Sequence, residues 1–305
     1  MNIVILGGGT AGLIAGLIIR EKYPFYDITI VKSSEMGIIG VGEGSTEHWA
    51  TFCQFVGIDI KDLIIKTDAT IKIGIRFTNW NGDNKSYIHS VDNFSEISSL
   101  QRHDVYNYLL SNQDSRDSEY NLNSDFKEVY LENKIPIDQN IFCSNQYHFD
   151  TFKLNEFLLE KCIQRSINII DTTILNAILR EDGSIKSLET SSDDITGDFF
   201  IDCSGFKRFL ANKLEQKWVS FKKFLPLDSA IVFPSEHCGD SYEPYTQATA
   251  LKNGWLWRIP TQKRYGNGYV FSSNYCNTEN ACEEVSDFYR LSNQKFREIK
   301  FEGVS

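Results

Sequence analysis

The chain has 305 residues, 41 acidic against 31 basic side chains, and a formal net charge of −10. This length is sufficient for a large core, whereas the negative charge, with no basic cluster in the sequence, disfavours a nucleic-acid-binding protein. The seven cysteines include no Cys-x-x-Cys pair, so we expect reduced thiols in a cytoplasmic protein, with neither zinc nor disulfides.

The N-terminal region has the pattern of a dinucleotide-binding β-α-β unit. Residues 2–6 predict an apolar strand, residues 10–21 a helix and residues 27–31 a second strand. Met1 leads almost directly into the first strand, which leaves no room for a signal peptide, and no apolar run is long enough to span a bilayer.

A glycine motif, Gly7-x-Gly9-x-x-Gly12, joins the first strand to the helix. Gly7 permits the tight turn, Gly9 lets a pyrophosphate approach the backbone, and Gly12 lets helix and strand pack closely. Thr10 and Ala11 begin the helix, whose N-terminus points at the phosphates. We therefore predict nucleotide binding; the alternative is a turn without a ligand.

The residue after the second strand departs from this pattern. The acid that usually binds the ribose is replaced by Lys32, which we expect to be a solvated charge. Glu35 would then make the ribose contact, or the contact is lost.

A second glycine-rich segment is Gly40-Val41-Gly42-Glu43-Gly44-Ser45. It exposes backbone N–H groups and allows positive φ angles, so it can hold the edge of a flavin or an anion. The alternative is a flexible surface turn.

Residues 71–78 alternate as one strand. Ile71 and the apolar residues at every second position share one face, and Lys72, Gly74 and Arg76 share the other. One interpretation is a solvated sheet face. The other is that Lys72 projects its ammonium into a cavity, where it donates to, or reacts with, an electrophile.

The middle of the chain predicts an insertion followed by a return to the nucleotide-binding scaffold. Residues 81–140 are polar, with helical pieces such as 105–110, and resemble a substrate or lid element. Beyond them we predict a helix over 152–162 capped by Asp150, short strands over 168–198 with a turn at Asp182-Gly183, and a buried strand over 199–205.

The turn that ends this strand is Asp202-Cys203-Ser204-Gly205. In flavoproteins with two dinucleotide-type segments, such a turn lies near the ribityl chain or the pyrophosphate, and this is one interpretation of Asp202 and Gly205. An Asx turn is the other. Farther on, residues 245–273 predict antiparallel sheet and residues 281–301 a helix.

Two indoles stand out in the predicted sheet, within Gly254-Trp255-Leu256-Trp257-Arg258-Ile259-Pro260. Trp255 and Trp257 project from the same face of a strand, and Pro260 ends it. Such a pair is usually part of a core. Beside a flavin, such a pair can also form a wall that keeps a bulky substrate away from the cofactor and lets only a small molecule through. We find neither metal-ligand spacing nor a Gly-x-Ser-x-Gly nucleophile frame.

Together these motifs resemble the flavin-dependent halogenases of the tryptophan halogenase type, over nearly the whole chain. Seven motifs occur in the family's order, and the Trp-x-Trp-x-Ile-Pro run is the family's marker. The seven are residues 7–12, 40–43, 71–80, Tyr147-His148-Phe149-Asp150, 202–206, Pro244-Tyr245-Thr246 and 254–260.

The resemblance implies a reaction, its cofactors and its partners. FAD, reduced by a separate flavin reductase, works with oxygen to oxidise chloride, bromide or iodide to hypohalous acid. This acid moves through a tunnel to the lysine that corresponds to Lys72, which passes the halogen to an electron-rich aromatic ring such as indole or tryptophan. Trp255, Trp257, Ile259 and Pro260 would separate flavin from substrate.

The implied fold is α/β: a FAD-binding Rossmann-type domain, as in the aromatic hydroxylases, interleaved with a β-rich, partly helical substrate region. We expect one domain over 1–305, with FAD-binding segments at 1–80 and 150–215 and substrate or tunnel segments at 81–149 and 216–305. Family members continue beyond this chain's last residue, so a fragment that binds FAD without turnover, and a hydroxylating monooxygenase, are the alternatives. A homodimer is left open.

Overall fold

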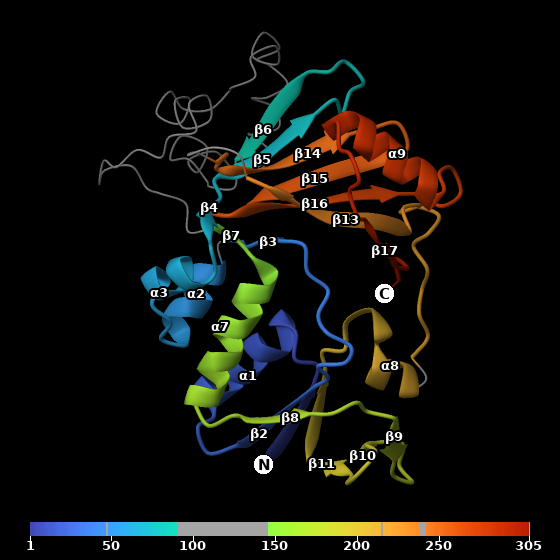
Figure 1. Cartoon of the computed structure of the whole chain (residues 1–305). Helices are drawn as coiled ribbons and strands as arrows, with labels where there is room; N and C mark the ends of the chain where they lie inside the picture. The colour runs from blue at the N-terminus through green and yellow to red at the C-terminus, as the bar shows by residue number, and fades with distance from the viewer. Residues whose placement is uncertain (47, 91–145, 215, 238–241, 305) are drawn as a thin grey trace, which may run out of the picture.

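The computed structural model describes residues 1–46, 48–90, 146–214, 216–237 and 242–304. The helical pieces expected near 105–110 and most of the polar insertion lie outside the described residues. In the described part, a four-stranded parallel sheet with its helices and a large second sheet are stacked with a small sheet between them (Figure 1).

The first layer is a parallel sheet in the order β12-β1-β2-β8. The strands are β1 (Asn2–Leu6), β2 (Asp27–Lys32), β8 (Asn168–Asp171) and β12 (Phe199–Asp202). Helices α1 (Thr10–Lys22) and α7 (Thr151–Gln164) pack on one face, where Leu13 and Leu154 join a core with Ile3 and Ile30. The two predicted strands and both helices are confirmed, because their apolar spacing matches the faces that become buried.

The opposite face of this sheet is covered by a smaller antiparallel sheet and α8 (Phe209–Lys213). Its strands are β9 (Asn176–Leu179), β10 (Ile185–Glu189) and β11 (Ile195–Thr196). The predicted turn at Asp182-Gly183 is confirmed, with Gly183 at φ +83°. The strand predicted at the start of 199–205 is confirmed as β12, but its predicted burial was wrong: β12 is an edge strand and Phe199 is 54% exposed, because only β1 pairs with it.

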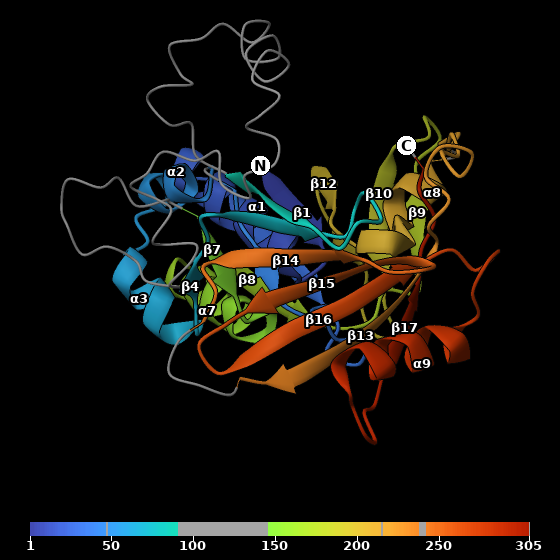
Figure 2. The ribbon, with the colours of Figure 1, turned by 90° about the horizontal axis from the view of Figure 1, so that it is seen from above.

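The second layer is a seven-stranded sheet in the order β17-β13-β16-β15-β14-β5-β6, seen face-on in Figure 2. Its strands are β5 (Gly74–Thr78), β6 (Ser86–Ser90), β13 (Ser229–Glu236), β14 (Tyr245–Ala250), β15 (Gly254–Pro260), β16 (Arg264–Phe271) and β17 (Arg297–Lys300). The antiparallel sheet predicted over 245–273 is confirmed.

The C-terminal helix is shorter than the sequence predicted. Helix α9 (Thr278–Tyr289) packs on the sheet, but Arg290 takes a positive φ angle and ends it. Residues 297–300 then pair with β13 instead of continuing the helix. The prediction of a helix over 281–301 was therefore wrong in its second half.

The small sheet, in the order β3-β7-β4, lies between the two layers. It consists of β3 (Glu43–Gly44), β4 (Thr70–Ile71) and β7 (Tyr147–Phe149), beside helices α2 (His48–Phe55) and α3 (Ile60–Lys66). The single strand predicted over 71–78 was wrong. Lys72 donates its backbone N–H to Gln146, and Ile73 donates to Pro244, so the chain leaves one sheet at Ile71 and enters the other at Gly74. Lys72 is therefore not in one strand with Arg76.

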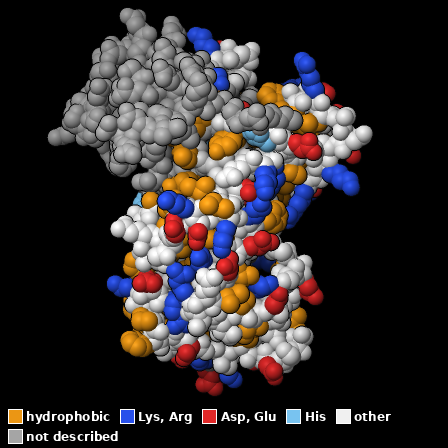
Figure 3. Space-filling model, turned by 60° about the vertical axis from the view of Figure 1, so that its left-hand side comes forward, with side chains coloured by type: hydrophobic (Ala, Val, Ile, Leu, Met, Phe, Trp, Pro, Cys, Tyr) orange, Lys and Arg blue, Asp and Glu red, His pale blue; other side chains and the backbone are white. Residues whose placement is uncertain are grey.

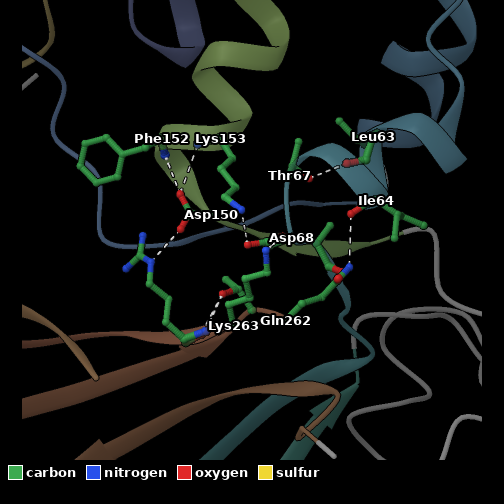
Figure 4. Close-up of polar contacts among 12 residues, drawn as sticks. Leu63, Ile64, Thr67, Asp68, Asp150, Phe152, Lys153, Gln262 and Lys263 are labelled. Atoms are coloured by element: carbon green, nitrogen blue, oxygen red, sulfur yellow. Dashed lines mark hydrogen bonds and ion pairs between the residues drawn. The ribbon is translucent and has the colours of Figure 1, made fainter. Parts of the chain in front are cut away.

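A hairpin turn between β15 and β16 fastens the two layers together (Figure 4). Asp68 pairs with Lys153 and, at 3.8 Å, with Lys263. Asp150 accepts hydrogen bonds from the first turn of α7, as predicted for its N-cap, and a charge-assisted one from Arg264 at 2.7 Å.

Replacing Asp150 by Asn is expected to destabilise the chain by about 3 kcal/mol, because it leaves Arg264 without its carboxylate while retaining the cap. Burial raises the pKa of Asp150, but the hydrogen bond from Arg264 and those from the α7 backbone outweigh it and hold the pKa below its usual value. The carboxylate's stabilising contribution is thus complete above the unfolded pKa and is lost as the pH falls through the folded one.

Denaturant unfolding from pH 7 down to pH 3 measures this effect. The difference between wild type and Asp150→Asn should shrink only below about pH 4. Asp182→Asn is the matched control, since the exposed carboxylate of Asp182 accepts hydrogen bonds only within its own turn. This substitution should lower the free energy of unfolding by less than about 1 kcal/mol. An Asp150→Asn protein as stable as wild type would contradict the fastening role.

Among the described helices, none is long and apolar enough to cross a membrane. On the described part of the face in Figure 3, acidic and basic side chains are interspersed with apolar ones, so that surface carries charge of both signs.

Candidate functional site

The turn after β1 forms a cradle whose shape depends on glycine. Gly7 has φ +124°, and a methyl group there would lie 2.2 Å from the carbonyl oxygen of Cys203. A methyl group on Gly12 would lie 1.9 Å from the oxygen of Gly7. A methyl group on Gly9, by contrast, would have no protein atom within 4 Å. Gly9 is the N-cap residue of α1 and makes no side-chain hydrogen bond there. Open space above the first N–H groups of a helix fits a pyrophosphate, so these residues fit FAD.

The end of β2 is occupied by an ion pair. Lys32 lies against Asp171 on β8 and also donates to Ser34 at 2.6 Å. Hydrogen bonds from Lys32 and Ser34 hold the pKa of Asp171 at about 2. Lys32 is thus a charge at the surface, as predicted, but one that is paired with Asp171. Glu35 accepts from Thr173 at 3.0 Å, and its contact with a ribose stays a prediction.

Asp202, at the end of β12, has both carboxylate oxygens engaged. One accepts from the N–H and hydroxyl of Ser204, which is the Asx turn considered as the alternative. The other accepts from the N–H groups of Leu210 and Ala211 at the start of α8. Gly205 has φ +65° with open space beside it. The contacts of Asp202 and Gly205 with FAD stay predictions.

The glycine loop (residues 40–45) is clamped between the layers, unlike a flexible surface turn. Gly42 donates its N–H to Thr151 at the start of α7, and a methyl on Gly42 would contact Ile259 at 3.3 Å. The oxygen of Val41 lies only 1.5 Å from where a methyl on Gly266 would be. These close contacts depend on the missing side chains of Gly42 and Gly266, and they pack the middle of the loop against β15 and β16.

Glu43 connects the glycine loop to the nucleotide cradle. Its carboxylate lies 3.5 Å from the hydroxyl of Thr10, the first residue of α1. Burial raises the pKa of Glu43, against a smaller lowering by the Thr10 hydrogen bond. The segment from Gly40 to Glu43 thus reaches the site where the helix N-terminus is exposed.

Lys72 lies at the other end of the same loop. Its side chain is buried, with only 8% of the residue exposed, and Nζ donates to the carbonyl oxygen of Ser45 at 3.1 Å. Gly44 leaves space here, since a methyl on it would lie 3.4 Å from Nζ. The interpretation of Lys72 as part of a solvated sheet face is therefore wrong.

The two indoles share one face of β15, as the sequence predicted. The ring centroids of Trp255 and Trp257 are 5.9 Å apart, and the ring of Trp257 lies over Gly268 on the neighbouring strand. Ile259 on the same face contacts the glycine loop, and Pro260 is the last residue of the strand. The indole wall and the loop that holds Lys72 are thus parts of one packed unit.

A cavity of about 360 Å³ borders the glycine loop on the side of the helices. It is lined by residues of α1, α2 and α7 together with Glu43 to Thr46. Neither Lys72 nor the Trp255–Trp257 pair is among its lining residues, so the passage from flavin to lysine stays a prediction.

Sequence reasoning missed one feature of the site, the buried His148 on β7. Its Nδ1 lies 3.2 Å from the hydroxyl of Thr70, and its Nε2 lies 2.9 Å from that of Thr246. The alternation of β7 could have signalled an inward-facing histidine, but only the pairing with β3 and β4 shows what it faces. Within the described ranges, no group of three or more His, Cys, Asp or Glu side chains is placed to hold a metal ion.

Comparison with known proteins decides the family. The family model described as tryptophan halogenase matches residues 2–303. The chain belongs to the tryptophan halogenase family.

Relatives of this family support the assignment in sequence and in structure. Tryptophan 6-halogenase SttH of Streptomyces toxytricini is 29% identical over 314 residues, covering 94% of this chain and 60% of the relative. Tryptophan 7-halogenase RebH of Lentzea aerocolonigenes is 28% identical over 324 residues, covering 98% and 61%. The structure of Xcc4156, a flavin-dependent halogenase from Xanthomonas campestris, matches with a TM-score of 0.85 at 28% identity, covering all of this chain and 62% of that one.

The resemblance inferred from the motifs is thus confirmed, as is the α/β fold with a Rossmann-type parallel sheet. This tryptophan halogenase family member spans about 60% of the length of the curated relatives that it matches.

Proposed function

We propose that the protein takes part in flavin-dependent halogenation of an electron-rich aromatic substrate of the indole or tryptophan type, with Lys72 as the halogen relay. The observation that carries this proposal is the position of Lys72. Its amine is buried and bonded to one end of the glycine loop, while Glu43 in the same loop contacts the start of α1.

The residues that would hold FAD follow from the cradle. Gly7, Gly9 and Gly12 leave room for the pyrophosphate, with Thr10 and Ala11 at the helix N-terminus beside it. Gly40, Val41, Gly42 and Glu43 would border the flavin ring, and Asp202 and Gly205 its ribityl side. Bound in the reduced state, FAD supplies the reduction of oxygen that turns a halide ion into hypohalous acid.

Lys72 can act on hypohalous acid in two ways. As an ammonium, Nζ donates a hydrogen bond to the acid's oxygen and polarises the bond to the halogen. As a free amine, Nζ attacks the halogen and forms an N–X bond, while the hydroxide that leaves takes up the amine proton as water. Transfer of X⁺ to the ring releases the ring proton, which restores the amine in the N–X route and combines with the hydroxide left by hypohalous acid, as water, in the ammonium route. Burial of Lys72 keeps bulk water away from either species.

The indole wall would keep the aromatic substrate from the flavin. Trp255 and Trp257 are packed as a pair on a central strand, and Ile259 fixes that strand to the glycine loop. A wall held in this way excludes a bulky ring from direct oxygen transfer and needs to pass only a small acid, with Pro260 fixing the end of the strand.

The proposal also includes a partner enzyme, a co-substrate and a cellular location. A separate flavin reductase would supply reduced FAD, and chloride, bromide or iodide would be the co-substrate. We also propose a cytoplasmic location, since the seven cysteines of the sequence include no Cys-x-x-Cys pair. The segment boundaries at 1–80, 81–149, 150–215 and 216–305, and a homodimer, stay predictions.

Supplying the purified chain with reduced FAD, oxygen, bromide and indole compounds tests the proposal by product mass. We expect a product heavier by one bromine in place of hydrogen, and no product without halide. A hydroxylated product that forms equally with and without bromide would identify a monooxygenase instead. A chain that retains no flavin absorbance and gives no product would identify a non-catalytic fragment.

A further inference from the structure

His148 occupies the centre of the small sheet and is fully buried, with 0% of the residue exposed. Gly44 on β3 and Thr70 on β4 are its direct neighbours across the strands. A histidine in such a place must have its ring nitrogens satisfied inside the protein, because no water reaches them.

The hydrogen bonds fix which nitrogen carries the proton. Thr70 donates its single hydroxyl hydrogen to the carbonyl oxygen of Pro260 at 2.8 Å, so it can only accept from Nδ1–H of His148. The Nε2 atom then carries a lone pair, which accepts from the hydroxyl of Thr246 at 2.9 Å. One neutral tautomer therefore satisfies both nitrogens, with partners from β4 and from β14.

The ring of His148 borders the same small space as the amine of Lys72. A methyl group on Gly44 would lie 3.4 Å from Nζ of Lys72 and 3.7 Å from Cδ2 of His148. Burial, and then the charge of Lys72, lower the pKa of His148 to about 3. At neutral pH the ring adds no second positive charge beside Lys72. The nearby acid, Glu43, is opposite Phe149 rather than opposite His148.

We propose that His148 is a positioning residue for Lys72: a neutral ring, protonated on Nδ1, that fills the space behind the amine and holds it against the oxygen of Ser45. This inference rests on the proposed role of Lys72 as the halogen relay. Since Nε2 already accepts from Thr246, the ring does not remove a proton from Lys72 or from substrate. It acts as a fixed wall rather than as a base.

Two-bond ¹H–¹⁵N spectra of the ¹⁵N-histidine-labelled chain test the tautomer without any turnover. His148→Gln, which removes one signal, assigns the resonance. We expect a protonated Nδ1 and an unprotonated Nε2, unchanged between pH 7 and pH 5. A doubly protonated ring, or a proton on Nε2 at pH 7, would overturn the proposal.

Reductive methylation with formaldehyde and borohydride, followed by peptide mass spectrometry, tests the positioning of Lys72. His148→Ala leaves a cavity beside the amine, so methylation of Lys72 should rise on the order of tenfold. Methylation of the exposed Lys22 in the same sample normalises the reagent dose, and circular dichroism shows whether the variant remains folded. His237→Gln is the control, because His237 stacks on Tyr265. It should leave the methylation of Lys72 unchanged.

Thr246→Val keeps the ring and removes only the donor to Nε2, so it remains informative if His148→Ala does not fold. We expect a smaller rise in Lys72 methylation and the same tautomer, because Thr70 still accepts from Nδ1–H. In halogenation, both variants should lower kcat, and neither should add a new titration near pH 6.5, the usual pKa of histidine. Unchanged methylation in both variants would overturn the positioning role, whereas loss of the Lys72 dependence itself would overturn the proposed function.

Discussion

Lys72→Met is expected to lower the rate of halogenated-product formation by roughly 10²–10⁴-fold, the range typical of a side chain that acts directly on a reacting group. Methionine has a similar length and no charge, so it fills the same buried space beside Gly44 and should leave the melting temperature unchanged or higher. Brominated product measured by mass spectrometry over time gives the rate.

Lys72→Arg separates the two ways in which the amine can act. A guanidinium keeps the positive charge and the hydrogen-bond donors of the ammonium. Partial activity of Lys72→Arg would therefore indicate that Lys72 polarises hypohalous acid, whereas an inactive variant would indicate that Lys72 forms an N–X bond. Lys66→Met is the matched control, because Lys66 lies on the surface against Glu160 and should matter to neither rate nor product. Full activity of Lys72→Met would refute the relay.

Gly9→Ala should lower the affinity of the chain for FAD by roughly 100-fold or more. The free energy of unfolding should change by no more than about 0.5 kcal/mol. The new methyl group meets no protein atom within 4 Å, and the backbone at Gly9, with φ −77°, suits alanine. It would, however, occupy the space in which the pyrophosphate approaches the helix N-terminus. Flavin fluorescence titration and thermal unfolding measure the two effects separately.

Gly12→Ala provides the contrast in the same loop. Its methyl group would lie 1.9 Å from the oxygen of Gly7, so the loop itself must shift, and we expect a loss of stability of about 2–3 kcal/mol. If Gly9→Ala binds FAD as wild type does, the pyrophosphate does not lie over this glycine, and the assignment of the cradle fails.

Local patterns were sufficient for the elements whose burial is decided by near neighbours in sequence. Strand β1, helices α1 and α7, the turn at Gly183 and the sheet around Trp255 and Trp257 follow from apolar periodicity, caps and turn glycines. The half of the C-terminal helix that was mispredicted is the part where Arg290 turns the chain toward a distant partner, β13.

The candidate site shows the same division. The sequence by itself determined the glycine cradle, the paired indoles and the family, because each depends on residue types at short, fixed spacing. Only the tertiary structure decided that Lys72 lies buried at a switch between two sheets, that Lys32 pairs with Asp171, and that His148 lies buried between Thr70 and Thr246. Those placements depend on hydrogen bonds between segments far apart in the chain, and short-range periodicity contains no information about which strands will pair.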